Sequence, residues 1–160
     1  MSPSETTLAP ADKSTGSATT LFVCSTCKAL GTVQADGETR QGRLLLDAVA
    51  ALAAHPEAHG PTLNIVGIEC LSNCKAGCTA AIAAPGKWTY VVGQLDAVAD
   101  AADLLAFACQ HASYPDGVPP WRARPQLGRS KVIARVPPIL AVPLKAAETA
   151  TNTSEPEPAV

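Results

Sequence analysis

The chain has 160 residues and a formal net charge of −2, and 47% of its residues are hydrophobic while only 4% are aromatic. This length suits one domain with an adequate core. The weak charge argues against a nucleic-acid binder, and no apolar run approaches the roughly 20 residues that span a bilayer. The amino terminus has neither the basic start nor the apolar stretch of a secretory signal. We therefore expect a cytoplasmic protein without a membrane partner, in which clustered cysteines indicate metal or redox chemistry before structural disulfides.

Composition divides the chain into four segments. Residues 1–19 and 141–160 are rich in Ser, Thr, Ala and Pro, which predicts disordered tails. Between them we expect one compact domain over 20–113, followed by a Pro-rich basic extension over 114–140.

The basic extension carries six Lys or Arg and no acidic residue between Val118 and Lys145. It is expected either to wrap the acidic domain, with Trp121 anchored in a groove, or to dock an acidic partner or a second copy of the chain. Because it contains one aromatic residue and no phosphate-cradling motif, nucleic acid is not the expected partner.

Hydrophobic patterning in the compact domain predicts four strands and two helices. In chain order they are a strand over 19–24, a helix over 39–57, strands over 62–69, 79–85 and 87–94, and a helix over 97–112. Asp96 is the expected N-cap of the last helix. The buried stripe of that helix is expected to comprise Val98, Ala102, Leu105 and Cys109.

The order of these elements predicts a thioredoxin-like α/β fold, β-α-β-β-β-α, with a mixed four-stranded sheet. A right-handed crossover makes the first two strands parallel. Cys24 ends the first strand and Cys70 follows the second. Because the carboxyl ends of parallel neighbours meet at one edge of a sheet, the cysteines that follow them are expected to meet.

Five of the six cysteines lie in two groups, which are Cys24 and Cys27, and then Cys70, Cys74 and Cys78. Together they can supply four soft ligands for zinc, cuprous copper or an iron–sulfur cluster. Structural zinc favours C-x2-C in both pairs, whereas C-x3-C suits a cluster whose two irons each take two thiolates. We therefore expect an iron–sulfur cluster, with a single metal ion and pure thiol chemistry as alternatives.

The thiol alternative rests on the C-x2-C that follows the first strand, which is typical of thioredoxin redox motifs. Residues 28–38 separate Cys27 from the first helix, so that helix is expected to be poorly placed to activate a thiol. Cys109 is expected to be a buried, inert thiol. The three histidines are expected at the surface, namely His55, His59 and His111. No catalytic constellation appears, so we do not expect an enzyme.

The segments "LFVCSTC", "CLSNCKAGC", "APGKWTYV" and "PPWRARP" together resemble an uncharacterised bacterial family of predicted metal-binding proteins, domain of unknown function 1636, over about residues 20–138. The resemblance implies metal binding and a link to cobalamin or cobalt metabolism. That family is in turn similar to thioredoxin-like [2Fe-2S] ferredoxins. The ligands that this similarity implies are Cys24, Cys27, Cys70 and Cys74.

Two departures from the ferredoxins concern the ligand set. Cys27 follows Cys24 more closely than the second ferredoxin cysteine follows the first, and Cys78 has no ferredoxin counterpart. Cys78 could replace Cys27 or bind a further iron of a [4Fe-4S] cluster. The sequence thus predicts a [2Fe-2S] carrier of single electrons to a redox partner enzyme, with a homodimer as a further expected contact. The alternatives are a zinc or cobalt delivery protein and a thiol-disulfide oxidoreductase.

Overall fold

A computed structural model describes residues 18–31, 35, 37–55 and 63–138. The two segments expected to be disordered tails, 1–19 and 141–160, fall outside these residues except at Ala18 and Thr19. Thr19, which was also assigned to the first tail, is buried and begins the first strand, where the predicted strand over 19–24 begins.

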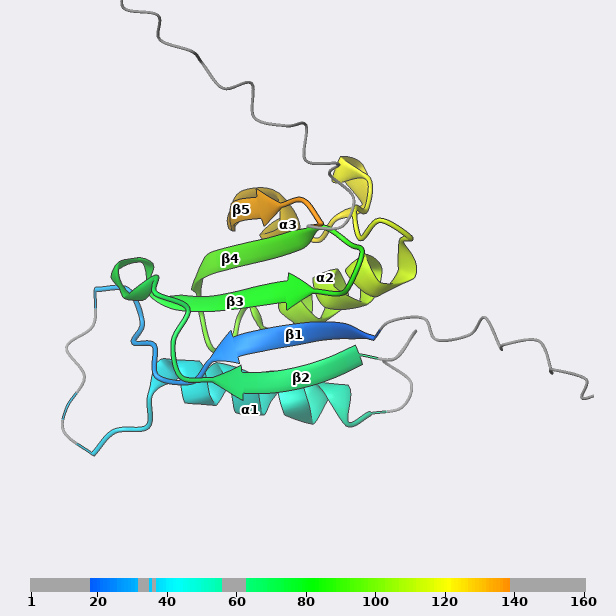
Figure 1. The fold of residues 1–160 in the computed structure, drawn as a ribbon. Coiled ribbons are helices and arrows are strands. Elements are labelled where there is room, and N and C mark those ends of the chain that lie inside the picture. Colours follow the sequence, from blue (N-terminus) through cyan, green and yellow to red (C-terminus); the bar gives the residue numbers. More distant parts are fainter. Residues whose placement is uncertain (1–17, 32–34, 36, 56–62, 139–160) are drawn as a thin grey trace, which may run out of the picture.

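Five strands form one mixed sheet in the order β2-β1-β3-β4-β5 (Figure 1). The strands are β1 Thr19–Cys24, β2 Leu63–Ile68, β3 Cys78–Ala83, β4 Thr89–Leu95 and β5 Val132–Val136. The strands β1 and β2 are parallel, and every other neighbouring pair is antiparallel. The thioredoxin-like α/β arrangement is confirmed, but the sheet has a fifth strand where four were expected.

The fifth strand comes from the Pro-rich basic extension. It pairs with β4 through Arg135 and Val136, and Pro137 then ends it. Its sequence, V-I-A-R-V, is mostly apolar, but as an edge strand it leaves most of its side chains exposed, and its Pro-rich basic surroundings did not predict a strand. Trp121, expected in a groove, is instead 58% exposed, with the Arg124 guanidinium 5.4 Å from its ring centroid.

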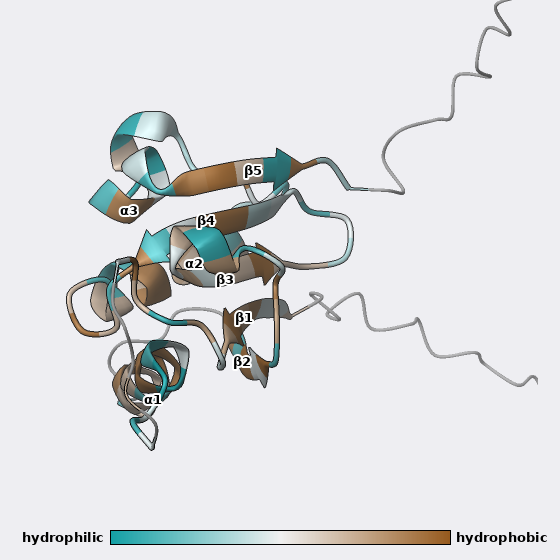
Figure 2. Ribbon diagram, turned by 90° about the vertical axis from the view of Figure 1, so that its left-hand side faces the viewer, coloured by the Kyte–Doolittle hydropathy of each residue, from teal (hydrophilic) through white to brown (hydrophobic). Residues whose placement is uncertain are grey.

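The main helices are α1 Gln41–Ala53 and α2 Ala101–Ser113, and they cover the same face of the sheet (Figures 1 and 2). The short helices are η2 Cys74–Ala76, η3 Trp121–Ala123 and α3 Gln126–Ser130. No described α-helix lies on the opposite face. Figure 2 shows hydrophobic residues concentrated on the strands and on the sheet-facing sides of the helices.

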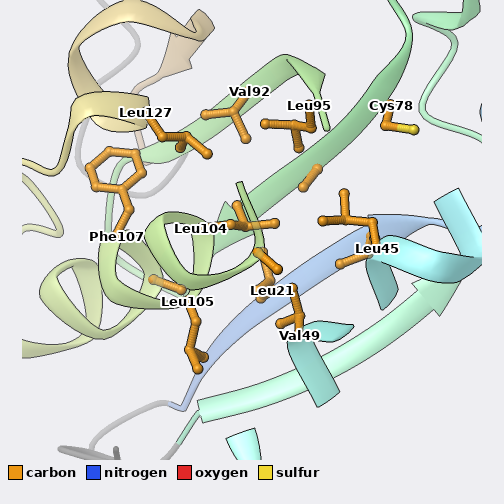
Figure 3. Packing of buried hydrophobic residues seen from close by; sticks show 14 of the residues in the cluster. Leu21, Leu45, Val49, Cys78, Val92, Leu95, Leu104, Leu105, Phe107 and Leu127 are labelled. Atoms are coloured by element: carbon orange, nitrogen blue, oxygen red, sulfur yellow. The ribbon is translucent and has the colours of Figure 1, made fainter. Parts of the chain in front are cut away.

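The core lies between the sheet and these two helices (Figure 3). Leu21 and Val23 alternate along β1, so both face the helices, where Leu45 and Val49 of α1 meet them. Cys78, the first residue of β3, belongs to the same cluster (Figure 3), and so do Cys24 and Cys27. Three of the five clustered thiols are therefore also core side chains.

Helix α2 begins four residues later than a cap at Asp96 implies. The Asp96 carboxylate accepts the N–H groups of Val98 at 2.9 Å and Ala99 at 2.8 Å, which closes a turn instead of a helix. Of the predicted stripe only Leu105 is buried, because Val98 is 82% exposed, Ala102 is exposed and Cys109 is only half-buried. The side chains that α2 buries are Ala101, Leu104, Leu105, Phe107, Ala108 and His111.

His111 is fully buried, contrary to the expected surface position. Its Nε2 donates to the Trp88 carbonyl oxygen at 2.7 Å, and its Nδ1 lies 3.2 Å from the Thr19 hydroxyl. The ring therefore joins α2 to the first residues of β1 and to the chain entering β4. Burial lowers the pKa of His111, since a charged imidazole would lose its hydration there. Of the other two histidines, His55 is exposed as expected, and His59 lies outside the described residues.

Because this imidazole is buried, the free energy of unfolding should depend on pH. Because the pKa of His111 is lower in the folded chain than its ordinary 6.5, the unfolded chain takes up the proton first as pH falls. The free energy of unfolding should therefore decline from pH 6.5 downward, by about 1.4 kcal/mol for each unit of lowering. Urea denaturation at a series of pH values measures this decline. His111→Gln should remove this part of the decline, and His55→Gln, at an exposed position, should leave it intact.

Candidate metal centre

The two thiol loops lie side by side at one edge of the sheet. The parallel register pairs Cys24 with Ile68, so both strands end together. Beyond that pair, the Ser25 N–H donates to the Ile68 carbonyl oxygen at 2.7 Å and the Ser25 hydroxyl donates to the same oxygen at 3.0 Å. The Thr26 hydroxyl donates to the Glu69 carbonyl oxygen. The two residues inside C-x2-C therefore fasten the first thiol loop to the second.

Cys24 is fully buried at the centre of the thiol group. Burial raises the pKa of Cys24, but hydrogen bonds to its sulfur outweigh burial and the pKa ends below its ordinary value. The donors are the Cys27 thiol and the backbone N–H groups of Thr26 and Leu71. The Cys24 thiol itself donates to the Glu69 carbonyl oxygen at 3.3 Å, so it both gives and accepts hydrogen bonds at the centre of the group.

Cys27 and Cys78 are buried on either side of Cys24 and remain protonated. Burial, followed by the hydrogen bond to Cys24 and the charge on it, raises the pKa of Cys27 to about 12. Burial, followed by the charges on Cys24 and Asp96, raises the pKa of Cys78 to about 11. The Cys78 sulfur lies 3.8 Å from the Lys28 carbonyl oxygen, so it contacts the first thiol loop directly.

Cys70 and Cys74 form a second pair, which is exposed. The Cys70 sulfur accepts the N–H of Ser72 at 3.2 Å, and the positive φ of 58° at Ser72 turns that N–H inward. The hydrogen bond with Cys70 and then the charge on Cys70 raise the pKa of Cys74. The charge on Cys24 adds to this rise, so the exposed pair lies within electrostatic range of the buried one.

The second loop is held against the first by two local features. The Asn73 side-chain amide donates to the Thr79 hydroxyl at 3.0 Å, which ties the loop to β3. Gly77 has φ of 76°, and a Cβ there would lie 3.1 Å from the backbone nitrogen of Leu30. Gly77 therefore permits both the turn and the close approach of the two loops.

Helix α1 begins directly against the first thiol loop, contrary to the expected separation. The Gly42 N–H donates to the Cys27 carbonyl oxygen at 3.0 Å. Only glycine fits, because a Cβ at Gly42 would lie 2.0 Å from the Cys24 carbonyl oxygen. The chain returns after residues 28–38, so sequence distance did not indicate spatial distance. The helix supports the loop backbone through this carbonyl.

The five thiols thus stand on two neighbouring loops, with Cys24, Cys27 and Cys78 buried and Cys70 and Cys74 exposed, and Cys78 contacts the first loop through the Lys28 carbonyl oxygen. In the described ranges of the chain, no three His, Cys, Asp or Glu side chains stand as a group that could hold a metal ion. Cys109, on α2, lies outside this gathering, lining a groove with Leu52 and Leu105.

The difference in exposure predicts an order of alkylation. With metal-free, reduced protein, iodoacetamide should modify Cys70 and Cys74 about tenfold or more faster than Cys24, Cys27 and Cys78, because only the first two meet solvent. Quenched samples analysed by peptide mass spectrometry give each rate. Urea should abolish the difference; equal rates in native protein would contradict this arrangement.

None of the helices in the described part of the chain is long and apolar enough to cross a membrane. A search of the curated proteins finds no match, and neither does a search of the solved structures. The family model described as "Protein of unknown function (DUF1636)" matches residues 21–138, which include both thiol loops and all but the first residues of the sheet. The chain therefore belongs to the DUF1636 family.

Proposed function

We propose that this chain is a small ferredoxin-like protein that binds an iron–sulfur cluster, most simply [2Fe-2S], and passes single electrons to a partner enzyme. The observation that supports the proposal is that the two loops carrying five thiols lie side by side at one sheet edge. Thiolate ligands favour soft metals and iron–sulfur clusters.

The pairing of the thiols supports a cluster over a single zinc ion. Tetrahedral zinc with bonds of about 2.3 Å needs four sulfurs about 3.8 Å from one another around one point. Here the first loop supplies the pair Cys24 and Cys27, and the second supplies Cys70 and Cys74. Such pairs suit a group in which each of two irons takes two thiolates. Cys24, Cys27, Cys70 and Cys74 would hold it, and Cys78 is the substitute ligand or the additional one for [4Fe-4S].

The surroundings favour negative charge on these sulfurs. Backbone N–H groups of Thr26 and Leu71 already point at Cys24, and the N–H of Ser72 points at Cys70. Lys28 and Lys75 are exposed beside the two loops. N–H donors and ammonium groups stabilise an anionic cluster and raise its potential. When bound, the cluster would supply one-electron redox chemistry near the surface, where the exposed second loop could meet a partner.

A thiol-disulfide oxidoreductase that uses Cys24 and Cys27 fits these contacts less well. Thiol-disulfide exchange needs an accessible nucleophile, yet Cys24 is 0% and Cys27 is 2% exposed. A zinc or cobalt delivery protein would use the same thiols without redox change. An electron carrier of the cytoplasm, without catalytic residues of its own, is the function that we propose. A role in corrin or cobalt metabolism would then lie with its partner enzyme.

Anaerobic purification without chelators tests the proposal. We expect brown protein with about two irons and two acid-labile sulfides per chain, and visible absorption that dithionite bleaches. Zinc in place of iron, or a cobalt–thiolate spectrum on titration, would favour the delivery protein. Protein that stays colourless after anaerobic reconstitution with iron and sulfide would overturn the proposal.

A further inference from the structure

The face of the sheet that α1 and α2 leave uncovered carries an apolar row across all five strands (Figure 1). In the strand registers this row comprises Val66, Phe22, Ala81, Val91 and Ala134. Their chain neighbours Leu21, Ile82 and Tyr90 belong to the core under the helices. Because side chains alternate along a strand, the row points to the opposite side of the sheet.

The row beside it is also uncharged. By the same registers it comprises Asn64, Thr20, Ala83, Thr89 and Val136. Val66 is 39% exposed and Val136 is 47% exposed. A sheet face that meets water usually carries polar side chains, and a large uncharged face is typical of a contact surface. Within the described ranges no α-helix lies on it (Figures 1 and 2), so we looked for its cover among the remaining residues.

The described chain marks both ends of this face. At the thiol end, a Cβ on Gly93 would lie 2.3 Å from the Ile133 Cδ1 and 2.8 Å from the Asn73 side-chain nitrogen, so these two side chains close that end. At the other end, a hollow of about 410 Å³ lies beside Val136 and Pro138. The last described residue is Pro138, so the chain continues from this hollow.

The residues that follow Pro138 match the face in polarity and length. Residues 139–144 read ILAVPL and contain no polar side chain, whereas the chain after Lys145 is rich in Thr and Glu. Six extended residues reach about 20 Å. The four spacings between five strands make about 19 Å. Residues 1–17 match less well, because Met1 and Leu8 are their only large apolar side chains.

A second copy of the chain is a poorer match for this face. Strands of five to seven residues in a five-stranded sheet give a face of roughly 300–400 Å². Stable interfaces bury roughly 800 Å² on each partner. A segment of the same chain needs less area, because its attachment at Pro138 keeps its local concentration high.

We propose that residues 139–144 cross the uncovered face from β5 to β2 and pack on the row that contains Phe22 and Val91. The segment gives the sheet a cover on its second side, and the polar residues after Lys145 extend beyond it. The proposal concerns the sheet alone, so it does not depend on the metal centre.

Photo-crosslinking of the full chain tests this position. Leu140→p-benzoylphenylalanine, irradiated and analysed by peptide mass spectrometry, should give links within one chain to Phe22, Ala81 or Val91. The same replacement at Thr151, in the polar part, should give few links to these residues. Links between two chains, links to α1 or α2, or no links from position 140 would overturn the proposal.

Dye binding gives an independent measurement. Val142→Asp places a charge in the segment and should release it, so the fluorescence of the apolar dye anilinonaphthalene sulfonate should rise severalfold while circular dichroism stays unchanged. Thr151→Asp adds the same charge outside the segment and should leave the fluorescence as in the unaltered chain. Equal fluorescence from Val142→Asp and the unaltered chain would show that the segment does not cover the face.

Discussion

Gly42→Ala is expected to destabilise the chain by about 2–4 kcal/mol, although alanine favours helices over glycine by about 0.5–1 kcal/mol. The added Cβ would lie 2.0 Å from the Cys24 carbonyl oxygen and 3.0 Å from the Cys27 backbone nitrogen. Both are backbone atoms, so neither can turn aside. The clash must shift α1 or the first thiol loop, and the Gly42 N–H bond to Cys27 would be lost.

Urea denaturation followed by circular dichroism measures this loss, and Gly67→Ala is its matched control. The Cβ at Gly67 would meet the tip of the Leu46 side chain at 2.5 Å, which can rotate away. We expect Gly67→Ala to cost about 1 kcal/mol or less. A Gly42→Ala chain as stable as the unaltered one would show that α1 does not support the thiol loop as described.

Cys24→Ser is expected to reduce bound iron and sulfide by about tenfold or more, the largest loss among the five clustered thiols. Cys24 is hydrogen-bonded to Cys27, and its charge raises the pKa of Cys74 and Cys78. Among the thiols of the two described loops, Cys24 influences the pKa of the largest number of the others. The serine hydroxyl can still donate to the Glu69 carbonyl oxygen, now 3.3 Å from the Cys24 sulfur, so the fold should persist.

Iron and sulfide assays after anaerobic reconstitution give the result, with circular dichroism to confirm the fold. Cys109→Ser, outside the centre, should bind as much iron as the unaltered chain. Comparison of Cys27→Ser with Cys78→Ser then identifies the fourth ligand. Only the variant that lacks a ligand should lose as much bound iron as Cys24→Ser. Retention of iron by Cys24→Ser would exclude the ligand set that we propose.

The crossover rule was sufficient to predict that the two thiol loops meet. Cys24 and Cys70 follow parallel neighbours, and the register of Cys24 with Ile68 confirms the shared edge. The inner strands were predictable for a related reason: burial on the helix face leaves an apolar pattern such as Leu21 and Val23. The edge strand β5 is also apolar in sequence, but it lies in a Pro-rich basic segment that did not predict a strand, and most of its side chains are exposed.

The contacts that shape the centre were less predictable, because they depend on the path of the loops. Ser25 and Thr26 fasten the loops through hydroxyl groups, and the only available signal was two hydrogen-bonding residues between cysteines. Gly42 lies in a predicted helix, and nothing near it in the chain indicates its contact with the Cys24 carbonyl oxygen. Nothing near His111 in the sequence predicted its burial. Its hydrogen-bond partners, the Thr19 hydroxyl and the Trp88 carbonyl oxygen, are distant in the chain.

Because β1 pairs with a later strand, the first thiol loop is synthesised before the segments that pack against it. At about 5–20 residues per second, Cys24 and Cys27 leave the ribosome about 3–10 s before Cys78 does. During that interval α1 and β2 are incomplete, and the first pair has neither the second loop nor its covering core. The nascent chain therefore carries bare thiols that the finished protein conceals. A system that loads the proposed cluster would have to act on a chain already folded through β3, with the early pair kept reduced until then.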